Sequence, residues 1–386
     1  MSERRDRRAR GAYPRHGFAS FAIALALGGL AALGRVGAAN AEILIGTAVP
    51  LVADFQGEQI LRGVEMAVTD LNTAGGVLGE EVRLVTIDDN CDASQALAAA
   101  RVFAAEEVVF VAGHLCSDAS LAAAAIYEEA GIVMISPGST NPRLTEEGRR
   151  NILRVVGRDD QQGTIAAARL AGEWKGSRIA ILSDDTAYGG GLAAETKREF
   201  NRLGQTEVLF ETYAAGRSDY SEVVEKLAAA KAEIVYVGGN YPELALIVRQ
   251  ARARGLDAQF VAGDGIATEV FWEIAGPAGE GTRFTFFPDP RRDPANADLA
   301  GRFRNAGFEP EGYTFFGYAA VQVWAQAAAR AGSTGTDKVS EALRKGEFQT
   351  TLGTLRFDDK GDLRDNAFVW YVWRDGGYEP EAPQGQ

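Results

Sequence analysis

The feature that most constrains the fold is an alternation of short apolar runs with helical runs, which is clearest between Val108 and Thr140. Val108–Gly113 and Ile132–Ile135 are both apolar and rich in β-branched residues. An alanine-rich run separates them, and each apolar run is followed by small polar residues. Short β-branched runs of this kind are typical of buried parallel strands joined by helices. The stretch therefore predicts strand, loop, helix, strand and loop of an α/β sheet.

The two loops that follow these strands are predicted to form part of a ligand site. In open α/β sheets, ligands bind in the crevice outside the carboxyl ends of the strands. The loops His114–Asp118 and Ser136–Thr140 lie at two such ends, one helix apart. Ser117, Ser139 and Thr140 supply hydroxyl groups there, and the loop backbones supply N–H donors, which together suit a carboxylate.

The same alternation continues through most of the chain. Glu42–Val49 is predicted to be the first strand, and a second strand–helix series begins with Arg178–Leu182. This order predicts parallel sheets with right-handed crossovers, and its coarse duplication predicts two similar lobes. Near the C-terminus, Thr354–Phe357 and Ala367–Trp373 are predicted to pair as a hairpin.

The first segment of the chain is predicted to be a secretory signal peptide. Arginines are frequent up to Arg15, Phe18–Leu33 is apolar and uncharged, and Ala39-Asn40-Ala41 is a small-x-small cleavage pattern. These are the three parts of an export signal. We therefore expect an exported mature chain that begins at Glu42.

The charge of the mature chain disfavours anionic partners. The formal net charge of the whole chain is −13, and residues 1–41 carry +5, which leaves −18 for the rest. A protein this acidic is a poor candidate for binding nucleic acid or anionic lipid. We expect no nucleic-acid partner and a monomer.

The chain has two cysteines, Cys91 and Cys116, which are 25 residues apart. In an exported protein with an even number of cysteines, a disulfide is the first expectation. Closing that loop would contribute ~3 kcal/mol in the chain-entropy model. The alternative is a thiol nucleophile, because His114 lies two residues from Cys116.

Other catalytic and metal signals are sparse. His114 is the one histidine after residue 41, so a catalytic triad is possible only through it. The sequence contains no Gly-x-Ser-x-Gly elbow, Walker A motif or Cys-x-x-Cys pair. The carboxylates of Asp88–Asp92 resemble a metal cluster, but helix capping by Asp92 or Ser94 is the preferred interpretation. We expect no metal and no cofactor.

The remaining side chains at predicted strand ends suit binding. Asp264 supplies a negative charge for an ammonium group, although a turn between two glycines would also explain it. Phe55, Tyr188, Tyr241 and Tyr313 supply aromatic walls, with core packing as the alternative. A carboxylate binder on one lobe and an ammonium binder on the other describe a clamp for a free α-amino acid.

At these loops the sequence resembles the periplasmic solute-binding proteins of branched-chain amino acid ABC transporters, of the leucine/isoleucine/valine-binding type. The resemblance covers essentially the whole mature chain. The matching motifs are Asp88-Asp89-Asn90-Cys91-Asp92, Gly113-His114-Leu115-Cys116-Ser117, Ser136-Pro137-Gly138-Ser139-Thr140, Tyr188-Gly189-Gly190-Gly191-Leu192, Gly238-Gly239-Asn240-Tyr241-Pro242-Glu243, Arg249-Gln250-Ala251-Arg252 and Lys360-Gly361-Asp362-Leu363.

The resemblance implies a type I periplasmic-binding-protein fold, with two Rossmann-like lobes, three crossing segments and a ligand in the cleft. With passages between lobes at Gly157–Asp160 and Pro288–Pro290, the expected organisation has four parts. These are a signal peptide at 1–41, lobe I at 42–158 plus 289–362, lobe II at 159–288 plus 363–380, and a C-terminal tail at 381–386.

The resemblance also implies roles for individual residues. Ser117, Gly138 and Thr140 would take the ligand carboxylate. Thr140 and Asp264 would take the ammonium group, with Tyr188 beside them. Phe55, Leu115, Cys116 and Tyr313 would flank the ligand side chain, and Cys91–Cys116 would be the family's disulfide.

Two positions depart from the family pattern, both in lobe II. Asn240 stands where the family carries tyrosine, with Tyr241 beside it as a possible substitute. Asp264 is one methylene shorter than the usual glutamate. Both departures bear on which ligand side chain is accepted.

We therefore expect a periplasmic, non-enzymatic substrate-binding component of an ABC importer. It would capture a free amino acid, branched-chain or otherwise apolar, and deliver it to a membrane permease. One alternative keeps the fold but binds an aromatic or dicarboxylic acid or an amide, as a transporter or a sensor. The other alternative is a hydrolase that uses His114 with Cys116 or Ser117.

Overall fold

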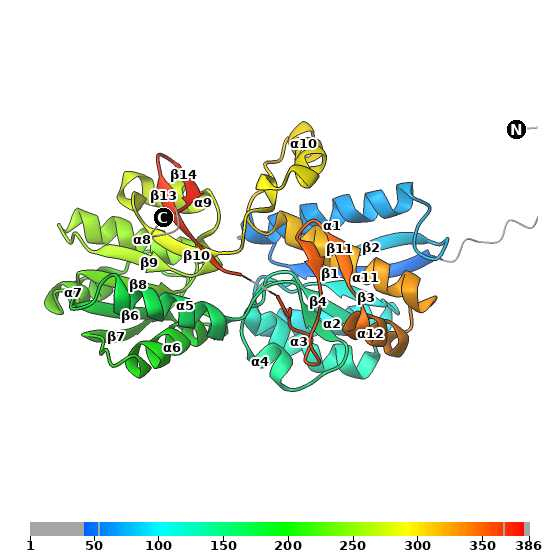
Figure 1. The fold of residues 1–386 in the computed structure, drawn as a ribbon, viewed down its shortest axis with the longest axis horizontal. Helices are drawn as coiled ribbons and strands as arrows, with labels where there is room; N and C mark the ends of the chain where they lie inside the picture. Colours follow the sequence, from blue (N-terminus) through cyan, green and yellow to red (C-terminus); the bar gives the residue numbers. More distant parts are fainter. Residues whose placement is uncertain (1–41, 53–54, 366, 382–386) are drawn as a thin grey trace, which may run out of the picture. The chain divides into compact units, whose positions relative to one another are not determined.

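The computed structural model of the chain describes residues 42–52, 55–365 and 367–381, and its ribbon is drawn in Figure 1. The predicted signal peptide, and the predicted tail beyond residue 381, lie outside the described residues. The described residues contain two large sheets, each with helices packed on both of its faces. The predicted α/β class with two lobes is confirmed.

The first lobe is built on a five-stranded parallel sheet in the order β2-β1-β3-β4-β5. Its strands are β1 (Glu42–Val49), β2 (Glu81–Asp88), β3 (Phe110–Ala112), β4 (Val133–Ser136) and β5 (Ile152–Arg154). Its helices are α1 (Phe55–Thr73), α2 (Ala93–Ala105), α3 (Ser117–Ala130), α4 (Arg143–Glu146), α11 (Thr314–Ala331) and α12 (Thr336–Lys345).

Successive residues of β3 serve opposite faces of this sheet. Phe110 stacks on Trp324 of α11, with ring centroids 4.9 Å apart. Val111, the next residue, packs in the cluster that contains Phe103 of α2 and Tyr127 of α3. The buried faces of α2 and α3 are mostly alanine, which lets these helices pack closely against each other. A strand buried on both faces needs the continuous apolar run that the sequence shows.

The second lobe is built on a seven-stranded sheet in the order β14-β13-β10-β9-β8-β6-β7. Its strands are β6 (Ile179–Asp184), β7 (Leu209–Tyr213), β8 (Ile234–Gly238), β9 (Gln259–Ala262), β10 (Arg283–Phe286), β13 (Val369–Arg374) and β14 (Gly377–Pro380). The run from β7 to β10 is parallel, as predicted, whereas β13 and β14 are antiparallel edge strands. Its helices are α5 (Asp159–Gly172), α6 (Ala187–Arg202), α7 (Ser221–Ala229), α8 (Tyr241–Ala253) and α9 (Val270–Ala275).

The predicted hairpin between Thr354–Phe357 and Ala367–Trp373 is wrong. β12 (Gly353–Leu355) pairs instead with β11 (Phe348–Thr350), and β13 pairs with β10 and β14. A turn does lie between the two predicted arms, where one isolated bridge joins Phe357 and Leu363. The aromatic residues of β13 bury their rings against β10 and β14, which outweighs pairing with the nearest strand in sequence.

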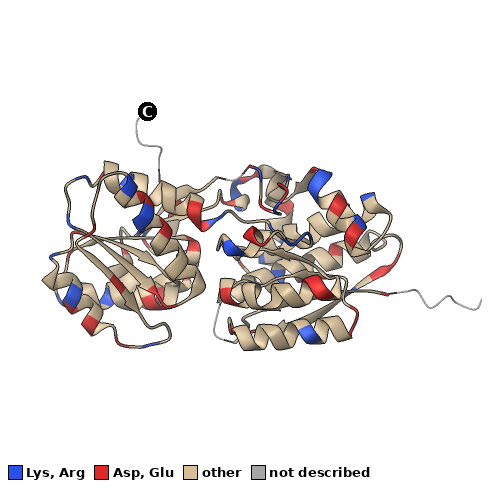
Figure 2. Ribbon diagram, turned by 90° about the horizontal axis from the view of Figure 1, so that it is seen from below, with Lys and Arg blue, Asp and Glu red and all other residues tan. Residues whose placement is uncertain are grey.

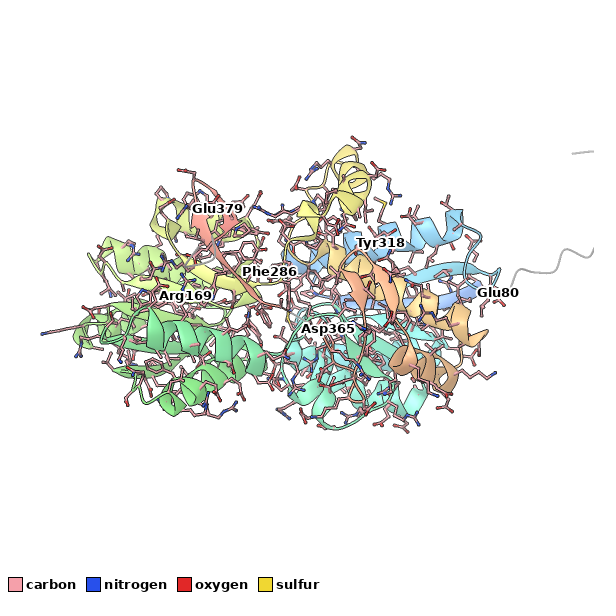
Figure 3. All side chains as sticks on the ribbon, viewed as in Figure 1. Glu80, Arg169, Phe286, Tyr318, Asp365 and Glu379 are labelled. Atoms are coloured by element: carbon pink, nitrogen blue, oxygen red, sulfur yellow. A yellow bond between two sulfur atoms is a disulfide. The ribbon has the colours of Figure 1, made fainter. Side chains whose placement is uncertain are left out.

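The chain passes between the two lobes at three places. It enters the second lobe after β5, returns after β10 through α10 (Ala297–Asn305), and enters the second lobe again between β12 and β13. At the end of β10, Phe286 packs edge-on against Tyr313 and Phe316, with ring centroids 5.4 and 5.9 Å away. Figure 3 labels Phe286 among the side chains. The residue boundaries of the lobes stay a prediction.

The charged side chains of both lobes are interspersed, with acidic and basic groups on neighbouring helices (Figure 2).

Within the described ranges, no helix combines the length and apolar character that crossing a membrane requires.

Candidate amino-acid-binding site

A cavity of about 210 Å³ is lined by residues at the carboxyl ends of strands from both sheets. This is the position at which α/β folds bind ligands. The cavity also reaches the start of α1 and the residue before α11. Its lining residues are Gln56, Cys91, Leu115, Cys116, Ser117, Asp118, Thr186, Tyr188, Ala215, Asn240, Pro242, Glu243, Asp264, Gly265 and Tyr313.

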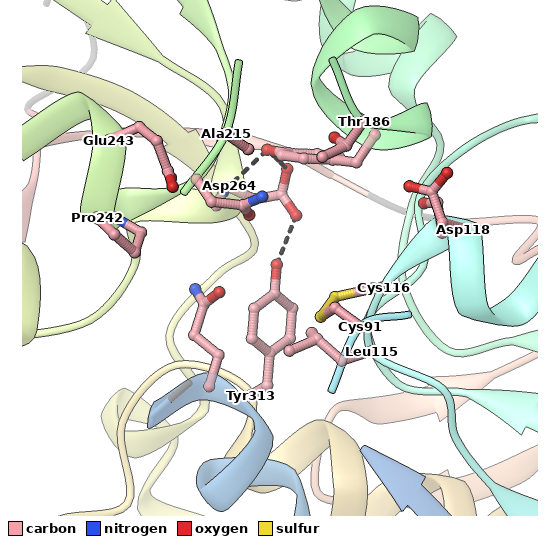
Figure 4. A pocket seen from close by; sticks show the side chains of 15 residues that line it. Cys91, Leu115, Cys116, Asp118, Thr186, Ala215, Pro242, Glu243, Asp264 and Tyr313 are labelled. Carbon is pink, nitrogen blue, oxygen red and sulfur yellow. Dashed lines mark hydrogen bonds between the residues drawn. A yellow bond between two sulfur atoms is a disulfide. The ribbon is translucent and has the colours of Figure 1, made fainter. Parts of the chain in front are cut away.

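Asp264 is the most deeply buried acidic residue of this cavity, and its side chain is drawn in Figure 4. It is 1% exposed and begins a single 3₁₀ turn after β9. Its Oδ1 accepts a hydrogen bond from the Tyr188 hydroxyl at 2.8 Å, and its Oδ2 accepts one from the Tyr313 hydroxyl at 2.5 Å. Burial raises the pKa of Asp264, and the two tyrosine hydroxyls oppose that rise. The tyrosines thus hold the carboxylate in place without neutralising it.

Hydroxyl groups of the first lobe approach the same region. Ser117 begins α3 and is 2% exposed, and Thr140 follows β4 and is fully buried. Ser117 Oγ has no hydrogen-bond partner within the described residues. Buried hydroxyls are normally satisfied, so this one is available to a ligand acceptor. The Thr140 hydroxyl lies beside Asp159, and its hydrogen bond opposes the rise in the pKa of that carboxyl group.

The two loops that carry these hydroxyls are tied to each other. Ser136 Oγ donates to the carbonyl of His114 at 2.7 Å and accepts from the N–H of Ser139 at 2.9 Å. Ser139 Oγ donates to the carbonyl of Leu115 at 2.9 Å. The Ser139 hydroxyl is therefore used to fix the loops, and its predicted role toward a ligand stays a prediction. A Cβ at Gly138 would lie 2.5 Å from Leu115 Cδ1, so this glycine lets the loops pack.

The predicted disulfide is present between Cys91 and Cys116, whose Cα atoms are 5.3 Å apart. This removes the Cys116 thiol nucleophile. His114 is fully buried, with Nδ1 2.6 Å from Asp89 Oδ2 and Nε2 2.9 Å from the Tyr127 hydroxyl. Both ring nitrogens are engaged away from Ser117, so this geometry does not support the hydrolase hypothesis.

Two of the four aromatic residues that were predicted to line the site do line the cavity, and the other two are not among its lining residues. Tyr188 and Tyr313 line the cavity. Phe55 packs instead on Phe308, with ring centroids 6.1 Å apart, and its N–H donates to the Tyr241 hydroxyl at 3.3 Å. Tyr241 is the first residue of α8 and is 4% exposed, while Asn240 before it faces the cavity.

The carboxylates of the suspected metal cluster are used in hydrogen bonds within the protein, and one of them caps a helix. Asp92 Oδ1 accepts from the N–H groups of Ser94 and Gln95, both at 2.9 Å, and so caps α2 as predicted. Among the described residues, no group of three or more His, Cys, Asp or Glu side chains has a metal-binding arrangement.

Several residues of the site were not predicted. Gln56, Asp118, Thr186 and Glu243 line the cavity from the starts of helices that follow strands. Asp159, at the start of α5, is fully buried, and the Thr140 hydroxyl lies beside its carboxyl group. Burial, and then the negative charge of Asp264, raise the pKa of Asp159 well above its ordinary value. In the sequence, Asp159 could have been noticed as an acidic residue just after the first predicted passage between the lobes.

Comparison with known proteins identifies the family. Residues 42–377 match the family described as periplasmic binding protein. The chain belongs to this family. The match runs from β1 to the first residue of β14, so the expected type I periplasmic-binding fold is confirmed for both lobes.

Individual relatives agree with that assignment. The chain is 46% identical over 343 residues to "Leu/Ile/Val-binding protein homolog 1" of Brucella suis biovar 1, covering 88% of this chain and 92% of the relative. It is 37% identical over 351 residues to the "Leucine-, isoleucine-, valine-, threonine-, and alanine-binding protein" of Pseudomonas aeruginosa, covering 91% and 94%. The solved leucine-binding protein LivK of Thermotoga maritima has a TM-score of 0.82 at 31% identity, covering 88% and 98%.

Proposed function

We propose that this periplasmic binding protein is the exported substrate-binding component of an ABC importer. It captures a free α-amino acid with a branched-chain or other apolar side chain and delivers it to a membrane permease. The names of the relatives support the ligand class, and the family supports the periplasmic location and a binding rather than catalytic role. The signal peptide, the permease partner and the monomeric state are parts of the same proposal.

The observation that carries this proposal is the uncompensated charge of Asp264. Its carboxylate is buried and held by two tyrosine hydroxyls, and no Lys or Arg of the described residues forms an ion pair with it. A buried charge is costly unless it is paired. The α-ammonium group of an amino acid would supply the missing charge.

The first-lobe side of the cavity suits the other end of an amino acid. The Ser117 hydroxyl lacks a partner within the described residues and can donate to a carboxylate, and the buried Thr140 hydroxyl lies in the same lobe. Leu115, the Cys91–Cys116 disulfide and Tyr313 supply apolar surface between the two polar ends. We assign the ligand carboxylate to Ser117, Gly138 and Thr140, and the ligand ammonium group to Thr140 and Asp264.

A second candidate keeps the fold and changes the ligand. Asn240 and Glu243 line the cavity on the second-lobe side, together with Asp118 from the first lobe. These polar groups favour an amide or another hydrogen-bond donor on the ligand side chain. The lining contains three acidic residues and neither Lys nor Arg, which weighs against a dicarboxylic acid.

Calorimetry distinguishes these ligands. The chain from Glu42 would be unfolded and refolded to remove carried ligand, then titrated with each proteinogenic amino acid. Tight binding of leucine, isoleucine or valine supports the first candidate, and tighter binding of asparagine or glutamine supports the second. If no amino acid of the panel binds, the proposal of an amino-acid receptor is wrong.

An Asp264→Ala variant tests the ammonium assignment. Loss of a charge-assisted partner should weaken binding by ~2–4 kcal/mol, or about 30- to 1000-fold in Kd. Asp257→Ala is the matched control, because Asp257 belongs to the same lobe and its side chain is fully exposed. Equal affinity of the Asp264→Ala variant and the wild type would refute the assignment.

A further inference from the structure

Ala187, the first residue of α6 in the second lobe, is held by two side chains of the first lobe. Asp118 Oδ2 accepts the N–H of Ala187 at 2.9 Å. Asn141 Nδ2 donates to the carbonyl of Ala187 at 2.7 Å. Both backbone groups of one residue are thus bound from across the cleft. We call this arrangement of Asp118, Asn141 and Ala187 the clasp.

The Asn141 side chain is fixed by its own lobe before it reaches across. Its Oδ1 accepts the N–H of Arg143 at 3.0 Å, which leaves the amide nitrogen directed at Ala187. The carbonyl of Asn141 accepts from Arg154 Nη1 at 3.0 Å. Asn141 is 5% exposed, so few other orientations are open to it. The donor is therefore already oriented for the contact.

The clasp explains part of the glycine run at the start of α6. A Cβ at Gly191 would lie 2.8 Å from Asn141 Nδ2, too close for the amide to keep its position. A Cβ at Gly190 would meet nothing nearer than the Asp184 carbonyl at 3.7 Å. A Cβ at Gly189 would overlap the Asp184 carboxylate and the Gly238 carbonyl. Gly191 is thus the glycine that makes room for the clasp, and Gly190 has no such role.

The clasp acts on the ligand site through the next residue. Tyr188 follows Ala187, and its hydroxyl donates to Asp264 at 2.8 Å and accepts from the N–H of Gly265 at 2.9 Å. Asp118 itself lines the cavity, and Figure 4 shows it beside Thr186, which caps α6. Fixing Ala187 therefore fixes the start of α6 and the position of Tyr188.

We propose that Asn141 is a positioning residue, which through the clasp holds the second lobe against the first around a bound ligand. This inference rests on the proposed function. When the lobes separate about the hinge, the clasp is exchanged for hydrogen bonds to water, so it favours only the closed form. Its loss should therefore raise the dissociation rate of the ligand and leave the association rate unchanged.

Four variants test this, with L-leucine as the first probe in stopped-flow measurements. Asn141→Asp keeps the acceptor for Arg143 but replaces the donor to Ala187 with a carboxylate oxygen, and Gly191→Ala displaces the amide. Each should raise koff by about three- to tenfold, the worth of one hydrogen bond. Gly190→Ala is the control, because it makes the same change one residue away and should keep the wild-type koff. The Asn141→Asp/Gly191→Ala double variant should dissociate no faster than the faster single variant.

Amide hydrogen exchange at Ala187 gives a readout that needs no ligand, because the clasp protects this N–H whenever the free protein is closed. Asn141→Asp and Gly191→Ala should speed exchange in the first turn of α6, and Gly190→Ala should not. If the wild type binds no amino acid, the proposed function fails while this measurement still tests the clasp. The inference would be overturned if Asn141→Asp and Gly191→Ala both kept the wild-type koff and the wild-type exchange rate at Ala187. It would also be overturned if Gly190→Ala changed these rates as much as the two variants do.

Discussion

Arg154 and Asp362 form a buried ion pair, with Arg154 Nε 2.7 Å from Asp362 Oδ1. Arg154 is fully buried, and Asp362 is 4% exposed. The same guanidinium donates from Nη1 to the carbonyls of Ser139 at 2.8 Å and Asn141 at 3.0 Å. The pair thus joins the end of β5 to the turn ahead of the third passage between lobes. It also supports the loop that carries Thr140.

Asp362→Ala should destabilise the fold strongly. It would leave Arg154 buried without its anionic partner, which costs ~3–5 kcal/mol for a broken buried pair. Urea unfolding followed by circular dichroism measures this. Asp365→Ala is the control, because Asp365 is exposed and its ion pair among the described residues is with exposed Arg356. It should change the free energy of unfolding by less than about 0.5 kcal/mol. Equal effects of the two variants would show that the buried pair is not stabilising.

The contact between α1 and α11 depends on two glycines. A Cβ at Gly63 would overlap the carbonyl of Thr314, and a Cβ at Gly317 would lie 2.5 Å from the carbonyl oxygen of Ile60. Gly317→Ala should lower the free energy of unfolding by ~1–3 kcal/mol, because the two helix backbones must move apart.

Gly301→Ala is the matched control for that change. Gly301 lies inside α10, and a Cβ there would meet nothing within 4 Å. The higher helix propensity of alanine should raise the free energy of unfolding by ~0.5–1 kcal/mol. Destabilisation by both variants would point to a general intolerance of alanine rather than to close packing of α1 and α11.

The sequence predicted the positions of helices and strands better than it predicted which strands pair with each other. Strand–helix alternation predicted the parallel cores of both sheets, because apolar runs of this kind form buried strands. Pairing at the edge of the second sheet could not be predicted in this way. β13 follows a turn and looks like the second arm of a hairpin, but its rings pack against Phe284 of β10 and Tyr378 of β14. Contacts this distant in sequence leave no local pattern.

The candidate site was predicted in part for a related reason. Strand ends indicated loops that line the cavity, and Asp264, Ser117, Tyr188 and Tyr313 are among its lining residues. The direction of each side chain depends on where the following helix starts. α8 begins at Tyr241, so Asn240 lines the cavity, whereas Tyr241 is buried with its hydroxyl on the N–H of Phe55. No periodicity in the sequence distinguishes two neighbouring residues at such a helix start.

Reducing the Cys91–Cys116 disulfide should destabilise the fold. The bridge closes a 25-residue loop between the ends of β2 and β3. The chain-entropy model gives it ~3 kcal/mol of stability. A Cys91→Ser/Cys116→Ser double variant should unfold at lower urea concentration, and adding reductant to the wild type should give the same midpoint. A reductant effect that persists in the double variant would point to a cause other than this bridge.

Glu311 is a buried carboxyl group between the two lobes. It is 2% exposed and lies three residues before α11 of the first lobe. Its Oε1 accepts from the N–H of Glu269 at 3.0 Å, from Thr268 Oγ1 at 3.3 Å and from Gln59 Nε2 at 3.3 Å. Burial raises its pKa to about 7, against the opposing effect of the Glu269 N–H.

This raised pKa predicts how stability depends on pH. The folded state binds the Glu311 proton more tightly than the unfolded state does. The stabilising contribution of Glu311 to the free energy of unfolding is therefore fully present below its ordinary pKa of 4.5. This contribution is lost as the pH rises through about 7. The wild type should therefore lose ~3 kcal/mol relative to Glu311→Gln between about pH 4 and pH 8, at ~1.4 kcal/mol per pKa unit. Urea unfolding of both proteins across this range measures the difference, in which the other titrating groups cancel. A difference that does not change with pH would show that the pKa of Glu311 is not raised in the folded protein.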